Sequence, residues 1–182
     1  MGDVGARKRL TNRGIEIKMT LRERLEQLPE GTWKNEMVSI KPILNQDDLI
    51  YATYDCQLTE EQKDFVNPSW FEIGRAFLDR DYNYPCIIYS VENKPVGFIN
   101  LKAWLLDKDA FSWSYYIDKD HQGKGYGKGA AQLAICIFKE ADPHAMIKLA
   151  TEKANKKAQV LYASLGFKLL PERDGDDLVF GL

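Results

Sequence analysis

Asp118-Lys-Asp-His-Gln122-Gly-Lys-Gly-Tyr-Gly-Lys128-Gly129 is the most informative stretch of the chain, because four of the 13 glycines lie within seven of its positions. An aromatic run typical of a strand, residues 111–117, precedes it, and an amphipathic segment, about residues 126–140, follows it. Glycine allows positive φ and lets a ligand approach bare backbone N–H groups. A helix that begins beside such a loop presents unpaired donors and partial positive charge. The stretch therefore predicts a strand–loop–helix unit that binds a pyrophosphate, with Lys124 and Lys128 adding charge.

Two other phosphate-binding motifs can be compared with this loop. A P-loop requires G-x-x-x-x-G-K-[ST], but its first glycine is missing here and Gly129 stands where serine or threonine is needed. Residues 125–130 satisfy the dinucleotide fingerprint G-x-G-x-x-A, and Glu152 lies at about the distance where a ribose-binding acid is expected. However, the polar residues 118–122 separate the strand from the glycines. A dinucleotide-binding fold is therefore kept as the weaker alternative.

The rest of the chain alternates between strand and helix patterns. Strands are expected at residues 38–44, 86–91, 96–101, 111–117, 146–150, 167–170 and 178–182. Helices are expected at residues 46–54, after a capping box at 59–62, and at 70–78, 126–140 and 155–165. On the longest of these helices, Ala130, Leu133, Ala134, Ile137 and Phe138 share one face. The order predicts one mixed α/β layer structure, an antiparallel meander followed by strand–helix–strand–helix–strand.

The first 36 residues differ from the remainder. Residues 1–18 are basic and polar, and Thr20 to Glu23 fits a capping box that opens a short helix with leucines on one side. A chain of 182 residues corresponds to about one domain. We therefore predict an extension over residues 1–36 and a single domain over residues 37–182.

Composition limits the class of protein. The formal net charge of −2 argues against a nucleic-acid binder with a large basic face. No apolar run approaches the ~20 residues of a membrane span, so we expect no membrane partner. Cys56, Cys86 and Cys136 are too widely spaced for a disulfide framework, and with only His121 and His144 beside them they suggest no metal site. A reduced, cytoplasmic protein is expected.

Two motifs together carry a resemblance to a known family. Gln122-Gly-Lys-Gly-Tyr-Gly127 matches Q/R-x-x-G-x-G/A, and residues 155–167 match N-x-x-A-x-x-L-Y-x-x-L-G-F. Over about residues 37–182 the chain resembles the GNAT N-acetyltransferases. It is most similar to the bacterial spermine/spermidine (diamine) acetyltransferases, a likeness carried by Gln62-Lys-Asp-Phe-Val66, Pro95-Val-Gly-Phe98, Tyr116-Ile-Asp118 and Gly175-Asp-Asp-Leu-Val179. The resemblance implies a mostly antiparallel central sheet of about six to seven strands, with a splayed strand pair and flanking helices. It also implies acetyl-CoA as cosubstrate, no metal, and a possible homodimer.

The same resemblance implies roles for individual residues. The backbone of Tyr115, Tyr116 and Ile117 would pair with the pantetheine arm, and one of its N–H groups would hold the thioester oxygen. Asn155 would bind the cosubstrate and cap its own helix. Tyr162 would protonate the departing thiolate, whereas without the motif it would be taken for a core aromatic residue. The loop residues that would bind pyrophosphate are Gln122, Gly123, Lys124, Gly125, Tyr126, Gly127 and Lys128.

The acceptor and its base are less sharply indicated. Glu152 and Glu72 are the candidate bases, and a water chain is equally compatible with the sequence. A polyamine is the first acceptor expected, provided that acidic residues gather on the substrate side; the candidates are Asp55, Asp64, Glu72, Asp79 and Asp81. Ser112-Trp113-Ser114 departs from the polyamine branch. The alternatives are an aminoglycoside-type antibiotic, a protein amine, or a non-catalytic acyl-CoA-binding module.

Overall fold

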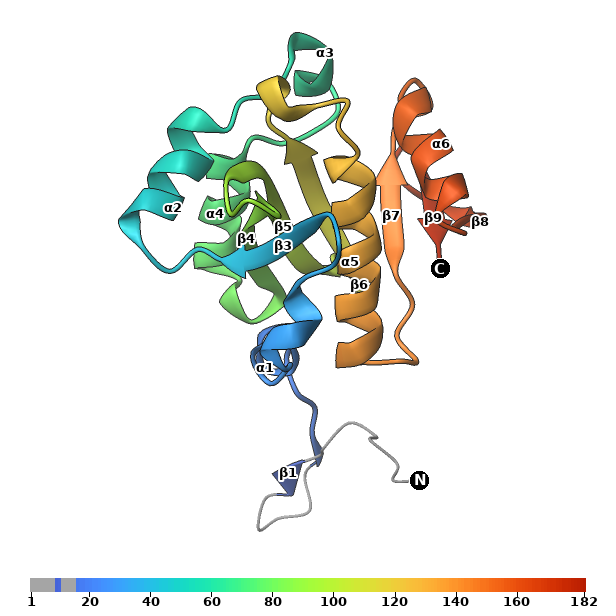
Figure 1. Cartoon of the computed structure of the whole chain (residues 1–182). Coiled ribbons are helices and arrows are strands. Elements are labelled where there is room, and N and C mark those ends of the chain that lie inside the picture. Colours follow the sequence, from blue (N-terminus) through green and yellow to red (C-terminus); the bar gives the residue numbers. More distant parts are fainter. Residues whose placement is uncertain (1–8, 11–15) are drawn as a thin grey trace.

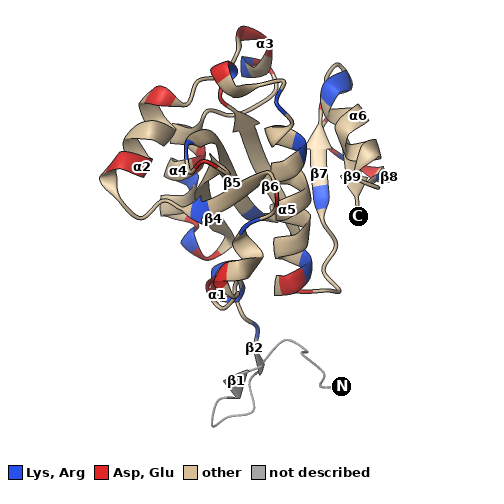
Figure 2. Ribbon diagram, in the orientation of Figure 1, with Lys and Arg blue, Asp and Glu red and all other residues tan. Residues whose placement is uncertain are grey.

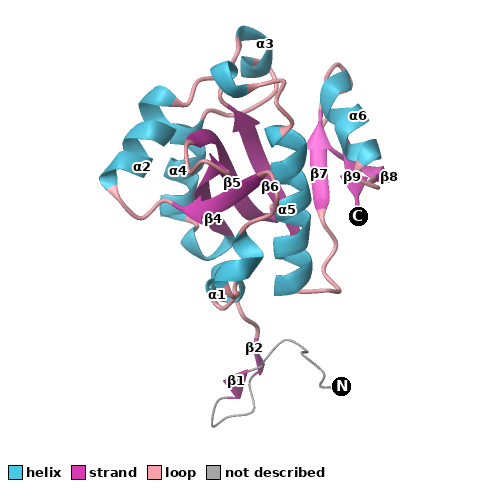
Figure 3. Ribbon diagram, in the orientation of Figure 1, coloured by secondary structure: helices cyan, strands magenta, loops and turns pink. Residues whose placement is uncertain are grey.

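Two antiparallel sheets and the helices around them form the fold (Figures 1 and 3). The computed structural model describes residues 9–10 and 16–182. The four-stranded sheet has the order β3 (Val38–Pro42), β4 (Asn83–Ser90), β5 (Pro95–Trp104) and β6 (Asp107–Ile117). The three-stranded sheet has the order β7 (Lys148–Thr151), β9 (Asp177–Gly181) and β8 (Lys168–Asp174). A short pair, β1 (Arg9–Leu10) and β2 (Glu16–Ile17), precedes both sheets. The predicted mixed α/β, mostly antiparallel class is confirmed.

Four of the described α-helices begin at a side chain that accepts a hydrogen bond from one of their first backbone N–H groups; these side chains are Thr20, Asn45, Thr59 and Asn155. The α-helices are α1 (Leu21–Glu26), α2 (Gln46–Ile50), α3 (Glu60–Lys63), α4 (Ser69–Leu78), α5 (Tyr126–Ala141) and α6 (Lys156–Ser164). Shorter turns are η1 (Glu30–Trp33), η2 (Tyr51–Asp55), η3 (Arg80–Tyr82) and η4 (Lys119–His121). Both expected capping boxes form, at Thr20 with Glu23 and at Thr59 with Gln62. The single helix expected over residues 46–54 is instead α2 followed by the π-helical turn η2.

Helix α1 is built into the hydrophobic core. Leu21 and Leu25 are 2% and 0% exposed, and both belong to the same cluster as the buried residues of α5. Arg24 pairs with Asp142 at the end of α5, with 2.5 Å between Nη1 and Oδ2. The boundary expected between residues 36 and 37 stays a prediction, but the helix before it shares the core of the residues after it.

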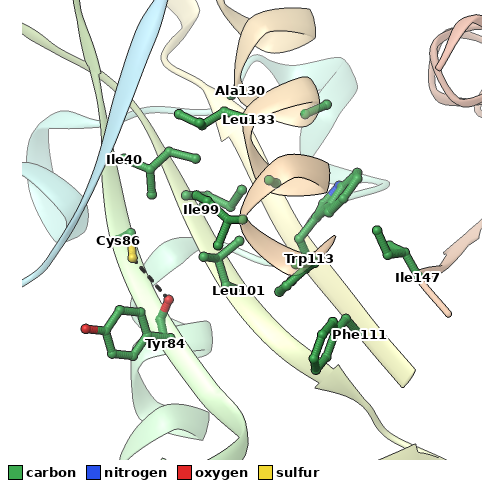
Figure 4. Packing of buried hydrophobic residues seen from close by; sticks show 14 of the residues in the cluster. Ile40, Tyr84, Cys86, Ile99, Leu101, Phe111, Trp113, Ala130, Leu133 and Ile147 are labelled. Atoms are coloured by element: carbon green, nitrogen blue, oxygen red, sulfur yellow. Dashed lines mark hydrogen bonds between the residues drawn. The ribbon is translucent and has the colours of Figure 1, made fainter. Parts of the chain in front are cut away.

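The main core lies between α5 and one face of the four-stranded sheet. The predicted apolar face of α5 is buried along its whole length. Figure 4 shows Ile99 and Leu101 of β5 and Trp113 of β6 pointing toward that helix. The opposite face of the sheet carries a second cluster that includes Phe98 and Tyr116, against η2. Strand residues therefore alternate between the two faces, which fixes the side on which each β6 side chain lies.

Among the described residues, the backbones of the two sheets pair at a single bridge. Phe111 of β6 and Ile147 form an isolated parallel bridge, in which the Phe111 N–H donates to the Met146 carbonyl at 2.8 Å. Beyond this bridge, no backbone pairing between β6 and β7 is found in the described residues. This is the splayed strand pair that the sequence resemblance implied.

Candidate active site

A cavity of about 720 Å³ opens where β6 and β7 part. Its wall is made of four segments, the end of β6, the glycine loop, the region from β7 to α6, and the segment around α3. In Figure 1, α3 lies at the same end of the molecule as the glycine loop and the start of α6. The residues that line the cavity include 113–117, 121–123, 126–127, 150–151, 154–158, 161–162, 59, 61–62 and 64–67.

The edge of β6 presents backbone groups to this cavity. The Phe111 N–H points toward β7, whereas the Asp118 N–H donates to Val96 beside β5 at 3.0 Å. Backbone N–H and C=O groups alternate in direction along an antiparallel strand. Those of Trp113, Tyr115 and Ile117 therefore point toward the gap between β6 and β7. These groups are spaced to pair with an extended ligand that lies along the strand.

Tyr116 is oriented differently from its neighbours. It lies opposite Phe98 in the pairing of β5 with β6, and its backbone groups face β5 by the same alternation. Its hydroxyl lies on the far face of the sheet, where it donates to the Cys56 carbonyl at 3.3 Å. Of the three strand residues predicted to bind acetyl-CoA, the structure therefore turns the backbone of Tyr115 and Ile117, and not of Tyr116, toward the cavity.

The clustered glycines serve different structural needs. Gly123 and Gly125 have φ of +77° and +86°, where a side chain would be strained. Gly129 packs so closely that a Cβ there would lie 2.9 Å from the Cβ of Met37. Gly127 has ordinary space, since its nearest neighbour would be 3.6 Å away. The first two glycines shape the loop, and Gly129 allows α5 to approach the start of β3.

The loop leads directly into the N-terminus of α5, a helix of 16 residues. Gln122, Gly123, Tyr126 and Gly127 line the cavity, so unpaired N–H groups of the first turn lie beside it. The Gln122 side chain donates to the Ile117 carbonyl at 3.1 Å and to Gln62 Oε1 at 2.8 Å, which ties the loop to α3. The remaining predicted loop residues, Lys124, Gly125 and Lys128, lie outside the cavity lining. The unpaired N–H groups at the N-terminus of α5 are suited to bind an anion in the cavity.

Tyr162 lies on α6 and lines the same cavity. Its ring packs against Phe167 and Phe180, with centroids 5.8 Å and 5.6 Å away. Burial raises the pKa of Tyr162 to about 12, so the phenol carries its proton at neutral pH. No hydrogen bond from this hydroxyl to another described residue is found, which leaves the proton available to a ligand.

Asn155 caps α6 and also lines the cavity. Its side-chain oxygen accepts a hydrogen bond from the Ala158 N–H at 3.1 Å. That bond uses the carbonyl of the side chain and leaves the amide N–H groups to donate elsewhere. The two predicted roles, helix cap and ligand donor, are compatible in this geometry.

Neither candidate base lines the cavity. Glu152 is exposed beyond β7, where its carbonyl accepts from the Asn155 N–H. Glu72 is 0% exposed and accepts from Asn100 Nδ2 at 2.8 Å. Burial alone would raise the pKa of Glu72, but Lys102 and Asn100 outweigh it and lower that pKa. Glu72 is thus a buried carboxylate engaged with a lysine, and direct contact with an acceptor is closed to it.

The expected acidic substrate side does not form around the cavity. Of the five acids considered, Asp64 lines it, Glu72 is buried below, and Asp79 pairs with Lys108 at 2.8 Å. Asp55 and Asp81 are exposed outside the lining. Figure 2 shows acidic residues spread over α1, α2, α3 and the end of α5. The charge pattern that would have favoured a polycation is absent from the described part of this cavity.

The sequence patterns did not indicate that three of the residues lining the cavity belong to the site. Glu61 of α3 and Lys157 of α6 form an ion pair with 2.7 Å between Oε2 and Nζ, and both line the cavity. Ser114 also lines it, and the unusual Ser112-Trp113-Ser114 run was the only sequence signal for it. The ion pair joins segments 96 residues apart, a contact that sequence patterns do not reveal.

Two other features, a metal centre and a membrane-spanning helix, are absent from the described residues. No group of three or more His, Cys, Asp or Glu that could hold a metal ion is present among them. Within the same part of the chain, no helix is both long and apolar enough to cross a membrane.

Comparison with known proteins agrees with this geometry. The profile of the acetyltransferase (GNAT) family matches residues 48–167, more than half of the chain. No curated protein matches at a significant level.

Solved structures share the fold at low sequence identity. An acetyltransferase from Agrobacterium tumefaciens is 19% identical, with 82% of this chain and 92% of that chain covered and a TM-score of 0.65. A spermidine N-acetyltransferase from Vibrio cholerae, in complex with CoA and spermine, is 16% identical, with coverage of 81% and 94% and a TM-score of 0.60. A ribosomal-protein-S5-alanine acetyltransferase from Vibrio fischeri is 17% identical, with coverage of 82% and 94% and a TM-score of 0.59.

Proposed function

Since the chain belongs to the acetyltransferase (GNAT) family, we propose that it transfers the acetyl group of acetyl-CoA to a primary amine by direct attack in a ternary complex. The observation that carries this proposal is the edge of β6, which beyond the Phe111 bridge pairs with no strand among the described residues. It faces a cavity that has the glycine loop at one end and the Tyr162 phenol on its wall. These are the parts that binding a thioester and releasing a thiolate require.

The described residues fit acetyl-CoA, which is a substrate of the reaction. The backbone of Tyr115 and Ile117 would pair with the pantetheine amides, because an unpaired strand edge complements an extended chain of donors and acceptors. The first turn of α5 would bind the pyrophosphate through its N–H groups. Asn155 would donate its side-chain amide to the same substrate.

Two groups of the chain would assist the transfer itself. A backbone N–H on the β6 edge would donate to the thioester oxygen as negative charge develops on it. When the amine nitrogen bonds to the acetyl carbon and the carbon–sulfur bond breaks, the sulfur would take the proton of the Tyr162 hydroxyl. The tyrosinate would then regain a proton from water.

The acceptor is proposed to be a small primary amine, with polyamines assayed first. The family resemblance and the solved spermidine N-acetyltransferase favour a polyamine, and Glu61 and Asp64 lie on the cavity wall. Because Glu61 is paired with Lys157, that wall attracts a polycation only weakly. A protein amine is the second candidate, since a solved ribosomal-protein acetyltransferase has the same fold.

A thiol-release assay with acetyl-CoA tests the proposal. The panel would contain spermine, spermidine, diamines, an aminoglycoside and a peptide with a free N-terminal alanine. Glu152→Gln is the matched control, because Glu152 lies outside the cavity, and it is expected to turn over at the wild-type rate. Titration calorimetry with acetyl-CoA accompanies the assay. Binding without turnover of any amine would favour the acyl-CoA-binding module, and absence of binding would refute the proposed site.

A further inference from the structure

A buried ion pair lies beneath the acceptor side of the cavity and has no part in the steps above. Glu72 of α4 is 0% exposed, and the side chain of its partner, Lys102 of β5, is 16% exposed. Their Oε1 and Nζ atoms are 3.5 Å apart. Removing two charges from water is costly even when they are paired. A well-packed apolar pair would avoid that cost, so the presence of this pair calls for an explanation.

The pair is connected to the cavity at two points. Lys102 Nζ lies 2.5 Å from Ser114 Oγ, and Ser114 lines the cavity. On the other side, Asn67 Nδ2 donates to Glu72 Oε1 at 3.3 Å, and Asn67 also lines the cavity. Asn100 holds the second carboxylate oxygen at 2.8 Å. Asn100 therefore holds the Glu72 carboxylate in place. Lys102 connects that carboxylate to the hydroxyl of Ser114, which a substrate in the cavity can contact.

The register of the sheet explains this contact. Lys102 is opposite Ser112 in the pairing of β5 with β6, and Asn100 is opposite Ser114. Lys102 and Ser114 are thus diagonal neighbours on one face, within reach of a long side chain. Ser114 also stands between Trp113 and Tyr115, whose backbone groups face the gap. Its hydroxyl therefore lies beside the stretch of β6 proposed to bind the thioester arm.

We propose that the Ser114 hydroxyl takes the proton of the attacking amine and passes its own proton to Lys102, which Glu72 holds in place. The inference rests on the proposed function. The step takes place in the form of the protein in which Lys102 of the ion pair has lost a proton to water. As the nitrogen–carbon bond forms, one N–H proton moves to Ser114 Oγ, and the Ser114 hydroxyl proton moves to Nζ of Lys102, which restores the ion pair. The resulting ammonium is stabilised by the Glu72 carboxylate and later returns its proton to water. Ser114 contacts the substrate, and Lys102 and Glu72 are positioning residues that act through it.

The charges around Lys102 are consistent with proton transfer from Ser114 to Lys102. Burial and the Arg75 guanidinium lower the pKa of Lys102, and they outweigh Glu72 and Asp174, which raise it. These groups come from α4 and from β8, the elements whose charges face Lys102. The uncharged fraction of Lys102 is therefore larger at a given pH than that of an exposed lysine. Activity should rise as pH increases through the pKa of Lys102.

Substitutions at the two residues separate proton transfer from structure. Ser114→Ala removes the hydroxyl and is expected to lower kcat about 100-fold or more, whereas Ser114→Thr keeps a hydroxyl and should retain most of the activity. Lys102→Arg keeps the charge and the donors but cannot accept a proton, because arginine stays protonated in proteins. It should lose activity as Ser114→Ala does, together with the acidic limb of the pH profile. All three variants should melt near the wild-type temperature and bind acetyl-CoA with unchanged Kd.

Two results would overturn the inference: wild-type kcat in Ser114→Ala, or a wild-type pH profile in Lys102→Arg. A readout independent of turnover is the NMR titration of lysine side chains labelled with ¹³C at Cε, with the Lys102 signal assigned from Lys102→Arg. Its midpoint should lie below about 10.4, the usual lysine value. A midpoint at or above that value also overturns the inference. If no amine on the panel is acetylated, the proposed function fails, and the titration still decides whether Lys102 is poised to accept a proton.

Discussion

Removing the phenol oxygen of Tyr162 is the most direct test of the chemistry. Tyr162→Phe keeps the ring that packs against Phe167 and Phe180, and no hydrogen bond to another described residue is lost. A positioned general acid contributes about 10²–10⁴ in rate, which corresponds to about 2.7–5.4 kcal/mol of barrier. We expect kcat to fall by that factor at saturating acetyl-CoA and amine. The free energy of unfolding should change by less than about 1 kcal/mol.

The assay measures thiol release, and calorimetry measures the Kd of acetyl-CoA in parallel. Because burial raises the pKa of Tyr162 to about 12, the wild-type rate should show no loss from this group between about pH 7 and 10. An unchanged kcat in Tyr162→Phe would place Tyr162 among the core residues only. A rise in Kd or a loss of stability as large as the loss of rate would also refute the role, since it would show that the oxygen serves binding or folding.

Three further substitutions test how the structure is held together. Leu25→Ala, at a position that is 0% exposed, should cost about 2–5 kcal/mol in urea unfolding; a cost near zero would make α1 a dispensable extension. Gly129→Ala places a Cβ 2.9 Å from a side-chain carbon at the start of β3, and should lower stability by about 1–3 kcal/mol, where an unchanged melting temperature would contradict the close approach. Partial burial would raise the pKa of Asp142, but the His144 N–H and Arg24 outweigh it and lower that pKa. The ionised Asp142 therefore stabilises the folded protein above about pH 4, and this contribution is lost as pH falls further. Arg24→Ala should cost about 1–2 kcal/mol at pH 7 and less at pH 3; an equal cost at both would exclude the ion pair.

Local patterns in the sequence predicted local structure well. The apolar face of α5 and both capping boxes follow from side chains within one or two turns of one another, and the structure confirms them. The glycine loop could be predicted for the same reason, since its backbone shape depends on its own residues. The placement of Tyr162 and Asn155 on the cavity wall followed from a motif whose spacing fixes one helix.

The part that could not be predicted depends on contacts between distant segments. Glu72 looked like a free acid on a substrate-side helix, but it lies under the sheet beside Asn100 and Lys102, which come from a strand about thirty residues later. Nothing in the residues near Glu72 indicates these partners. The orientation of Tyr116 depends on the register between β5 and β6, which a one-residue shift would reverse.

The unpaired edge of β6 has a consequence for how the chain can vary. The groups that it offers are peptide N–H and C=O groups, which every residue other than proline supplies in full. If the edge binds acetyl-CoA as proposed, substitutions at Trp113, Tyr115 and Ile117 are limited by the packing of their side chains and not by the ligand. The three solved structures compared above share only 16–19% of their residues with this chain. A proposed binding surface made of main-chain groups leaves few constraints on residue identity, so a search for it by sequence must rely on the glycine loop and the α6 motif instead.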